Sequence, residues 1–488
     1  MHDTGNWLVP HFGGEIYSHK PPFYFWFLNF NRFLFGGYSV TAVVLASLIP
    51  GILIALLTFY WGSLSFNLKY GFLSGLILMT AFYFFALSIT VRMDHLMGLF
   101  IISALFSFYL GYSSAAENKK KFYYLIYVFM ALSTWIKGPA GFLIPLIVIP
   151  VFLLIQKDTG EFKNLELKKG ALIFTAAILL WLVPALLKGG KDYAYELLIV
   201  QTFGRTVNSF AHQRPVYYYL ETFSFTFLPW SFFLYSAFIY CFRKRKELPR
   251  FIKFLLSWFI TTFLFFSLIS GKLDIYLLPI YPAGAMLAAY LFKETADKKA
   301  SKYYIIIPAV ITLGFLALGS FFIPQELNGI ALKNLLLPTI SSWILGALIG
   351  LILLFKKKYS YISYLVIIIF TVFLLNFSFS AAEPFSQTYT VKPAAEELKE
   401  LNSDGIKHIA VYKYDGDSAA LGVYLDFWPD VVNNPADFLT YLEQEEIALM
   451  VETKDWQSFD GQLVKKIEKE FEILKFNQNY IIITDYRK

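Results

Sequence analysis

The chain has 488 residues, of which 57% are hydrophobic, 19% aromatic and only 16% charged. Since a soluble domain carries about 25% charged residues, this composition excludes a set of soluble domains, a fibrous protein, a disordered chain and a soluble nucleic-acid binder. The net charge of +7 is interpreted as the basic bias of cytoplasmic loops rather than as a nucleic-acid interface. The single cysteine, Cys241, excludes a disulfide framework and a cysteine-based metal site.

The dominant pattern is a series of apolar runs, most of them long enough to cross a bilayer as an α-helix. Backbone groups must be paired within hydrocarbon, so these runs are expected to be helical. They predict an all-α polytopic membrane protein with about twelve transmembrane helices. The predicted spans are 38–62, 70–90, 96–112, 121–136, 139–156, 170–189, 218–241, 251–269, 275–293, 303–323, 335–355 and 360–380.

Lysine and arginine are distributed unevenly between alternate loops, and the denser set is expected to be cytoplasmic. Its basic clusters lie at 119–121, 157–169, 243–246, 293–302 and 356–358. The N-terminal segment, the sparse loops and the C-terminal tail are then outside. An outside N-terminus needs a preceding helix to cross the membrane, so the chain is expected to begin late, inside the first outside loop.

From about residue 384 the chain becomes polar, and a small extramembrane α/β domain is predicted there. Strands are expected at 409–412, 447–451 and 480–484, with helices near 392–401, 435–444 and 461–470. The expected organisation is an N-terminal interfacial segment (1–37), a transmembrane domain (38–383) and the α/β domain (384–488).

The sparse loops hold nearly all the unusual polar residues, and ionisable groups at a membrane boundary usually have a function. Lys20 precedes two prolines, which predicts extended backbone there and a helix directly after it. Its ammonium is a candidate for binding a lipid phosphate, or is an interfacial cation that reaches toward water. His19 beside it is either a metal ligand or a structural histidine.

Arg92 and Asp94 lie in a tight turn between two predicted spans. They could pair with each other, or Asp94 could position or deprotonate a substrate while Arg92 lies near an anion. Lys137 lies before a Gly-Pro turn and is either an anchor or a phosphate contact.

The segment 190–217 is predicted to be the longest loop of the membrane part. Arg205 can hold an anion with its planar guanidinium, and His212 can ligate a metal or carry a proton. The tyrosines at 217–219 could instead form an interfacial aromatic belt.

Lys272 and Tyr276 open the predicted span that begins at 275. Residues four apart share one face of a helix, so a cation and a phenol could grip a phosphate together. Alternatively, Lys272 anchors the helix end at the membrane surface.

Five cations in separate loops fall on one predicted side of the membrane: Lys20, Arg92, Lys137, Arg205 and Lys272. Such a ring suits a lipid phosphate or diphosphate, where neutralising a phosphate leaving group is the natural catalytic contribution. An enzyme outside the cytoplasm cannot rely on nucleotides, so a lipid-phosphate-linked donor is expected.

Five motifs occur in an order typical of one family: GNWLVPHFGGEIYSHKPPFYFW, RMD, WIKGPAGFLIP, GRTVNSFAHQRPVYYYL and SGKLDIYLLPIYP. Over about residues 5–380 the chain resembles the bacterial GT-C type polyprenyl-phosphate-sugar glycosyltransferases. Within these it is similar to the branch of 4-amino-4-deoxy-L-arabinose lipid A transferase and protein-mannosyltransferase-like enzymes. The resemblance implies donor or phosphate binding by Tyr17, Lys20, Lys272 and Tyr276, and metal binding by His212.

Two departures from the family pattern matter. Relatives often carry glutamate before the Lys-Pro-Pro, where this chain has His19; a His19/His212 pair is then the candidate site for a divalent metal such as Zn or Mg. The family also has a first transmembrane helix and an acidic motif ahead of the segment matching Gly5–Trp7. The main catalytic aspartate is therefore expected upstream of Met1, and Asp94 is assigned an orienting or second-base role.

The resemblance implies transfer of a sugar from undecaprenyl phosphate to a lipid A, glycan or protein acceptor at the periplasmic face of the inner membrane. Membrane lipids are expected partners and nucleic acid is not. Two alternatives stay open, namely a transporter or flippase of lipid-linked sugars and an inactive, truncated glycosyltransferase. The transporter class predicts inverted repeats and broken helices near the midplane, and the sequence shows neither.

Overall fold

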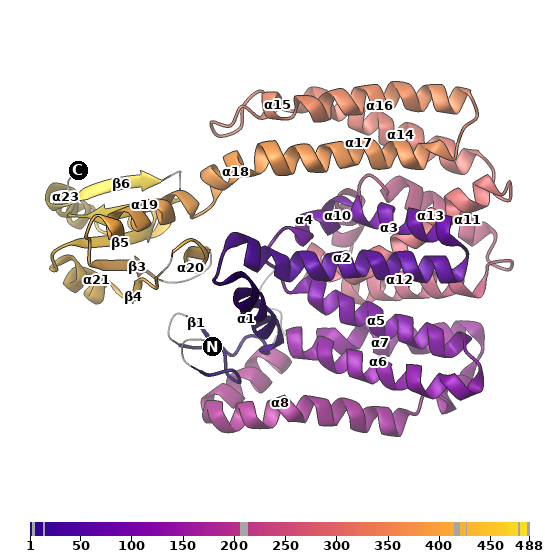
Figure 1. Cartoon of the computed structure of the whole chain (residues 1–488), viewed down its shortest axis with the longest axis horizontal. Coiled ribbons are helices and arrows are strands. Elements are labelled where there is room, and N and C mark those ends of the chain that lie inside the picture. Colours follow the sequence, from indigo (N-terminus) through magenta and orange to yellow (C-terminus); the bar gives the residue numbers. More distant parts are fainter. Residues whose placement is uncertain are drawn as a thin grey trace. The chain divides into compact units, whose positions relative to one another are not determined.

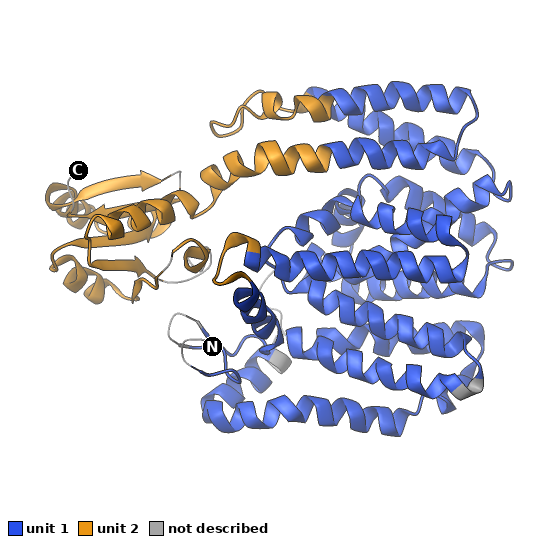
Figure 2. Cartoon of the chain, in the orientation of Figure 1, with its two compact units in different colours: residues 1–34, 42–321, 341–372 blue, residues 35–41, 322–340, 373–488 orange. Residues whose placement is uncertain are grey.

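The computed structural model describes residues 1, 5–12, 15–204, 213–413, 420–425, 427–476 and 479–485. The chain forms two compact units, coloured separately in Figure 2. Unit 1 comprises residues 1–34, 42–321 and 341–372, and unit 2 comprises residues 35–41, 322–340 and 373–488.

Unit 1 is a bundle of helices (Figure 1), most of them apolar around the whole circumference as expected for helices within a membrane. Its helices are α1 (Phe23–Phe35), α2 (Val40–Ser65), α3 (Leu68–Met79), α4 (Phe82–Ser88), α5 (Asp94–Ser113), α6 (Ala116–Lys137), α7 (Ala140–Gln156), α8 (Leu167–Tyr195), α10 (Tyr218–Thr226), α11 (Ser231–Arg243), α12 (Arg250–Leu268), α13 (Tyr281–Ala296), α14 (Tyr303–Gly319) and most of α16 (Leu337–Phe355) and α17 (Tyr361–Asn376). The central helix is α13, which is buried over nearly its whole length and packs against α3, α11 and α12.

Eight helices within the described residues are long and apolar enough to cross a membrane, or up to ten spans if two bent pairs each count as one. The predicted polytopic α-helical class is therefore confirmed, although about twelve spans were expected. The predicted spans 121–136 and 139–156 correspond to α6 and α7. Lysines crowd the start of α6, and α7 has only 17 residues, so neither helix is among the eight.

Two predicted straight spans are bent in the structure. The axes of α3 and α4 differ by 70°, and those of α10 and α11 by 117°. Two hydrogen bonds connect the α3–α4 break to the α10–α11 break. The Phe82 amide donates to the Leu228 carbonyl at 2.8 Å, and the Trp230 indole donates to the Thr80 hydroxyl at 3.0 Å. Backbone groups freed by a break in an apolar environment need such partners, and Pro229 explains why the helix stops between α10 and α11.

The prediction of a loop from residue 190 was wrong for its first part. Helix α8 continues to Tyr195, and a π-helical segment follows at Glu196–Gly204. Gly190, with φ of +77°, produces a kink inside the helix instead of ending it. A glycine pair among polar residues favours a helix end, but only the backbone shows that the helix resumes.

Unit 2 contains a five-stranded sheet of β3 (His408–Tyr412), β4 (Asp430–Val432), β5 (Ile447–Glu452), β6 (Glu472–Phe476) and β7 (Tyr480–Thr484). Its order is β4-β3-β5-β7-β6, with β4, β3 and β5 parallel and β7 antiparallel to both β5 and β6. Helix α19 (Lys392–Ser403) precedes the first strand, whereas α20 (Leu421–Tyr424), α21 (Pro435–Leu442) and α23 (Gly461–Glu470) lie in the connections β3–β4, β4–β5 and β5–β6. All three strands and all three helices expected there are confirmed; the edge strands β4 and β6 were missed because one is short and the other only partly buried.

Candidate functional site

Four of the polar motifs meet at one end of unit 1. They lie at the start of α5, at the end of α6, before α10 and between α12 and α13. Side-chain and backbone contacts connect the first motif to the second, the second to the fourth, and the third to the fourth. Loops far apart in the sequence therefore form one polar cluster at the end of an apolar bundle.

The centre of this cluster is an ion pair between Asp94 and Lys137. The Lys137 Nζ atom lies 2.5 Å from Asp94 Oδ1, and the two side chains are only 17% and 4% exposed. Asp94 begins α5 and Lys137 ends α6, so each charge also complements the dipole of its own helix. Gly138, with φ of +68°, caps α6 and lets the chain turn directly into α7.

Arg92 does not pair with Asp94, which was one of the two alternatives for this turn. Arg92 is exposed. Its backbone is held by the Ser47 hydroxyl, which donates to the Arg92 carbonyl and accepts from the Arg92 amide, both at 2.8 Å. The turn is thus fixed to α2 through the backbone, while the guanidinium stays at the surface of the cluster.

Lys137 also contacts Tyr276. Its Nζ atom lies 5.2 Å from the centroid of the Tyr276 ring, a distance at which a cation is attracted to an aromatic face. Tyr276 belongs to the 3-10 helix η3 (Asp274–Ile280), which leads into α13. The phenol ring thereby forms one side of the Asp94–Lys137 pair.

The expectation that Lys272 and Tyr276 share a helical face was wrong, because η3 begins only at Asp274. Lys272 is 2% exposed, and its ammonium donates to the Arg214 carbonyl at 3.0 Å and to the Ile269 carbonyl. Burial lowers the pKa of Lys272 below its usual value. The lysine therefore ties the segment before α10 to the segment after α12, and the Arg214 amide strengthens this link by donating to the Ser270 carbonyl at 3.1 Å.

Asp274 is a site residue that the sequence analysis did not single out. The Tyr218 hydroxyl donates to Asp274 Oδ2 at 3.2 Å, whereas Oδ1 is buried with no hydrogen-bond partner among the described residues. The neighbouring Tyr219 hydroxyl donates to the Leu273 carbonyl at 3.0 Å. Two of the three tyrosines proposed for an aromatic belt thus bind the first residue of η3 and the residue before it. An acidic residue two positions from Lys272 was the available signal in the sequence.

Tyr24 is a second residue that the motif analysis passed over. It is 4% exposed and lies on α1, which begins directly after Pro22 as predicted. Burial raises the pKa of Tyr24, and the charge of Asp94 acts in the same direction while that of Arg92 opposes it. Tyr24 therefore stays a neutral phenol within electrostatic reach of the ion pair.

The Lys-Pro-Pro segment is attached to the end of α6 by aromatic packing. Phe23 and Trp26 lie 6.2 and 5.9 Å from Trp135, measured between ring centroids. Ahead of them, the Tyr17 ring packs at 5.0 Å against His19, which is exposed, and Lys20 is half-buried. The segment that carries Tyr17 and Lys20 is thus anchored beside the helix that carries Lys137.

Two expected site residues, Arg205 and His212, lie outside the described residues, so the anion clamp and the His19/His212 metal pair stay predictions. Within the described part of the chain, no group of three histidine, cysteine, aspartate or glutamate side chains could hold a metal ion.

Comparison with known proteins points to one kind of enzyme. The family model for dolichyl-phosphate-mannose-protein mannosyltransferases matches residues 19–187. An uncharacterized protein of Aquifex aeolicus (strain VF5) is 27% identical over 66% of this chain and 63% of its own length. The undecaprenyl phosphate-alpha-4-amino-4-deoxy-L-arabinose arabinosyl transferase 2 of Proteus mirabilis (strain HI4320) is 28% identical over 60% of this chain and 53% of its own length. The matches thus span between half and two thirds of these curated relatives.

Two solved structures share the fold of this chain. ArnT from Cupriavidus metallidurans in the apo state superposes with a TM-score of 0.79, at 17% identity, over 100% of this chain and 91% of that chain. The same protein bound to undecaprenyl phosphate gives a TM-score of 0.77, at 16% identity, over 100% of this chain and 92% of that chain. The resemblance found in the sequence is therefore confirmed, and the chain has the GT-C fold.

Proposed function

We propose that this multi-pass membrane protein of GT-C fold transfers a sugar from undecaprenyl phosphate to an acceptor at the periplasmic face of the inner membrane. The observation that carries the proposal is the polar cluster at one end of unit 1, where Asp94, Lys137, Lys272 and Asp274 come together from separate motifs. The relatives named for undecaprenyl-phosphate-linked aminoarabinose transfer support the donor class. Lipid A, another glycan and a protein all remain acceptors within the proposal.

The proposed reaction needs positive charge where the donor phosphate leaves. An acceptor oxygen attacks the anomeric carbon, a new C–O bond forms, and the bond to the phosphate oxygen breaks so that the lipid phosphate departs with the electron pair. Lys20 and Arg92 have ammonium and guanidinium groups at the membrane boundary, and we assign them to this phosphate together with Arg205 and Tyr17. Lys137 is paired with Asp94, so its contribution is a fixed charge beside Tyr276.

Carboxylates are needed only for a hydroxyl acceptor, whose proton must be removed. The resemblance implies that an aspartate removes this proton. Asp94 is held by Lys137, which suits the orienting role proposed for it. Asp274 has one buried carboxylate oxygen without a partner among the described residues, and we propose that this oxygen accepts a hydrogen bond from the acceptor.

The membrane orientation is also a proposal. The denser basic clusters are placed in the cytoplasm, which puts the cluster around Asp94 and the α/β region from about residue 384 in the periplasm. A periplasmic site fits a donor that arrives within the membrane, because its phosphate lies at the bilayer surface while its polyprenyl tail stays in hydrocarbon.

The test is sugar transfer by this protein in a bacterial host that lacks its own aminoarabinose transferase. Mass spectrometry of lipid A and of total glycoconjugates should show a new sugar with the wild type and none with Lys20→Ala. Lys188→Ala, which removes an exposed lysine on α8, is the matched control and should transfer normally. Unchanged turnover in Lys20→Ala would remove that lysine from the mechanism. The wild type could insert correctly and still modify nothing, both in cells and as purified protein supplied with donor and lipid A. That result would favour the transporter or the inactive alternative.

A further inference from the structure

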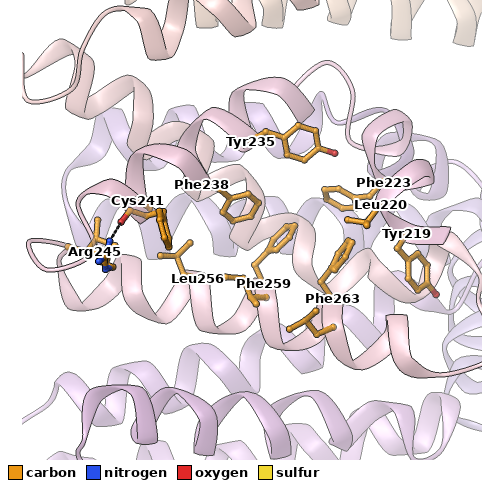
Figure 3. Close-up of a pocket in the computed structure, with 14 residues that line it drawn as sticks. Tyr219, Leu220, Phe223, Tyr235, Phe238, Cys241, Arg245, Leu256, Phe259 and Phe263 are labelled. Carbon is orange, nitrogen blue, oxygen red and sulfur yellow. Dashed lines mark hydrogen bonds between the residues drawn. The ribbon is translucent and has the colours of Figure 1, made fainter. Parts of the chain in front are cut away.

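Unit 1 has an apolar groove away from the polar cluster. It lies between the bent pair α10–α11 and α12 and has a volume of about 490 Å³, within the range of sites that hold small molecules. Figure 3 shows its aromatic wall, which includes Phe223, Phe238 and Phe259, with Tyr219 at one end and Arg245 at the other. A long apolar slot with a cation at one end matches the shape and polarity of a lipid chain with an anionic headgroup.

The groove opens toward the hydrocarbon side of the bundle. Leu220, Phe242, Ile260 and Leu264 belong to its lining and are 65%, 71%, 46% and 54% exposed. These side chains lie on the candidate span α12 and the bent pair α10–α11, so we expect the opening to face acyl chains and not water. An acyl chain can therefore enter sideways from the bilayer.

The cation at the end of the groove is part of a strongly basic turn between α11 and α12. This turn contains four consecutive cations, Arg243 to Lys246, of which Lys244 pairs with Glu247 at 2.9 Å. Within the described residues, neither Arg243 nor Arg245 forms an ion pair with a carboxylate. The Arg245 guanidinium donates to the Phe242 carbonyl, at 3.2 Å, and lies 5.1 Å from the centroid of the Phe242 ring. Uncompensated positive charge thus coincides with the end of an apolar slot.

A second groove lies on the other flank of α11, against α14, and repeats this arrangement. It has a volume of about 440 Å³ and includes Arg243 in its lining, while Tyr235 lines both grooves. Arg243 donates to the Tyr304 hydroxyl at 3.0 Å, which holds the guanidinium at the rim of this second groove. Each flank of α11 therefore combines an apolar slot with one arginine of the same turn.

We propose that the α11–α12 groove binds one acyl chain of an anionic phospholipid, whose phosphate is held by Arg245. Charge complementarity selects an anionic over a zwitterionic headgroup, because the turn carries several cations and one carboxylate. The polar cluster lies beyond the opposite end, where Tyr219 bonds to Leu273. The lipid proposed here is thus distinct from the sugar donor, and the inference does not depend on the proposed function.

The first measurement is native mass spectrometry of the purified protein in a nonionic detergent, titrated with phosphatidylglycerol or phosphatidylcholine. Wild-type protein should bind phosphatidylglycerol at least fivefold more tightly, the ratio expected when one basic residue at a membrane surface contacts an anionic headgroup. Arg245→Gln should lose about that factor. Lys246→Gln removes the same charge from the same turn outside the groove lining, and its affinity should change less than twofold.

A second pair of variants tests the acyl slot without changing the charge. Leu256→Trp fills the groove and should displace both lipids, whereas Leu268→Trp, on an exposed part of the same helix outside the lining, should leave binding unchanged. Equal affinity for the two lipids, equal losses in the two charge variants, or undiminished binding in Leu256→Trp would each overturn the proposal. Displacement of bound phosphatidylglycerol by undecaprenyl phosphate, with a loss of undecaprenyl phosphate affinity in Arg245→Gln, would assign the groove to the donor instead.

Discussion

Removing Lys137 should damage the protein through the carboxylate that it leaves behind. Asp94 is 4% exposed in its side chain, and its Oδ1 atom is 2.5 Å from the lysine ammonium. In Lys137→Met the aspartate would be a buried, uncompensated charge, and breaking a buried pair in this way costs about 3–5 kcal/mol of stability. The double variant Asp94→Leu/Lys137→Met removes both charges and should recover most of that loss, because an apolar pair of similar volume is often as stable as a buried ion pair.

Stability and activity separate the structural role of this pair from its role in the site. Unfolding in mixed micelles should rank wild type and the double variant together, with Lys137→Met well below both. Transfer activity should be lost in both variants, because neither retains the charge beside Tyr276. The reasoning would be refuted if the double variant were as unstable as Lys137→Met, or if it transferred sugar at the wild-type rate.

Three further predictions concern the same end of unit 1. In Gly141→Ala the new Cβ atom would lie 2.4–2.6 Å from the Ser133 backbone, so the α6–α7 turn should shift and the free energy of unfolding should fall by about 1–3 kcal/mol. The control variant Gly314→Ala has open space at its new Cβ atom and should not lose stability. Equal stability of the two variants would contradict the packing argument. Since burial lowers the folded-state pKa of Lys272, the stability of the wild type should rise as the pH increases through that pKa. Lys272→Met should abolish this rise in stability. If the rise persists in the variant, another group causes it. Asp274→Asn should impair transfer while preserving the Tyr218 hydrogen bond and the melting temperature, and normal turnover for a hydroxyl acceptor would remove Asp274 from the site.

The sequence predicts which helix ends gather but not how their side chains pair. Asp94 and Lys137 are 43 residues apart, the length of the helical hairpin α5–α6, so alternate loops were expected on one side. Whether Asp94 would face Arg92 or Lys137 depends on the rotation of α5 about its axis, which an apolar run around the whole helix does not encode. Only the structure therefore shows that Asp94 pairs with Lys137 and not with Arg92.

The bends and the 3-10 helix were missed for a related reason. An apolar run shows that a segment is buried in hydrocarbon, and Pro229 accounts for the helix end before α11. The direction in which the chain continues and the late start of η3 at Asp274, however, depend on partners supplied by other segments. In the polar C-terminal region, by contrast, local sequence pattern and turn residues mark the longer elements, and the three internal strands and the helices α19, α21 and α23 were predicted. Edge strand β4 has only three residues, which are too few to form a recognisable strand pattern.

The proposed chemistry on a membrane-anchored phosphate would account for the position of the polar residues at helix ends. Within hydrocarbon a charged side chain is costly, while at a helix terminus the same charge is favoured by the dipole when Asp begins a helix and Lys ends one. The Asp94–Lys137 pair uses both effects at once, at the junction of two antiparallel helices. A lipid-linked phosphate reaches this depth because its tail keeps it at the boundary. An antiparallel bundle thereby lets single residues in distant loops form one charged surface without any charge crossing the apolar core.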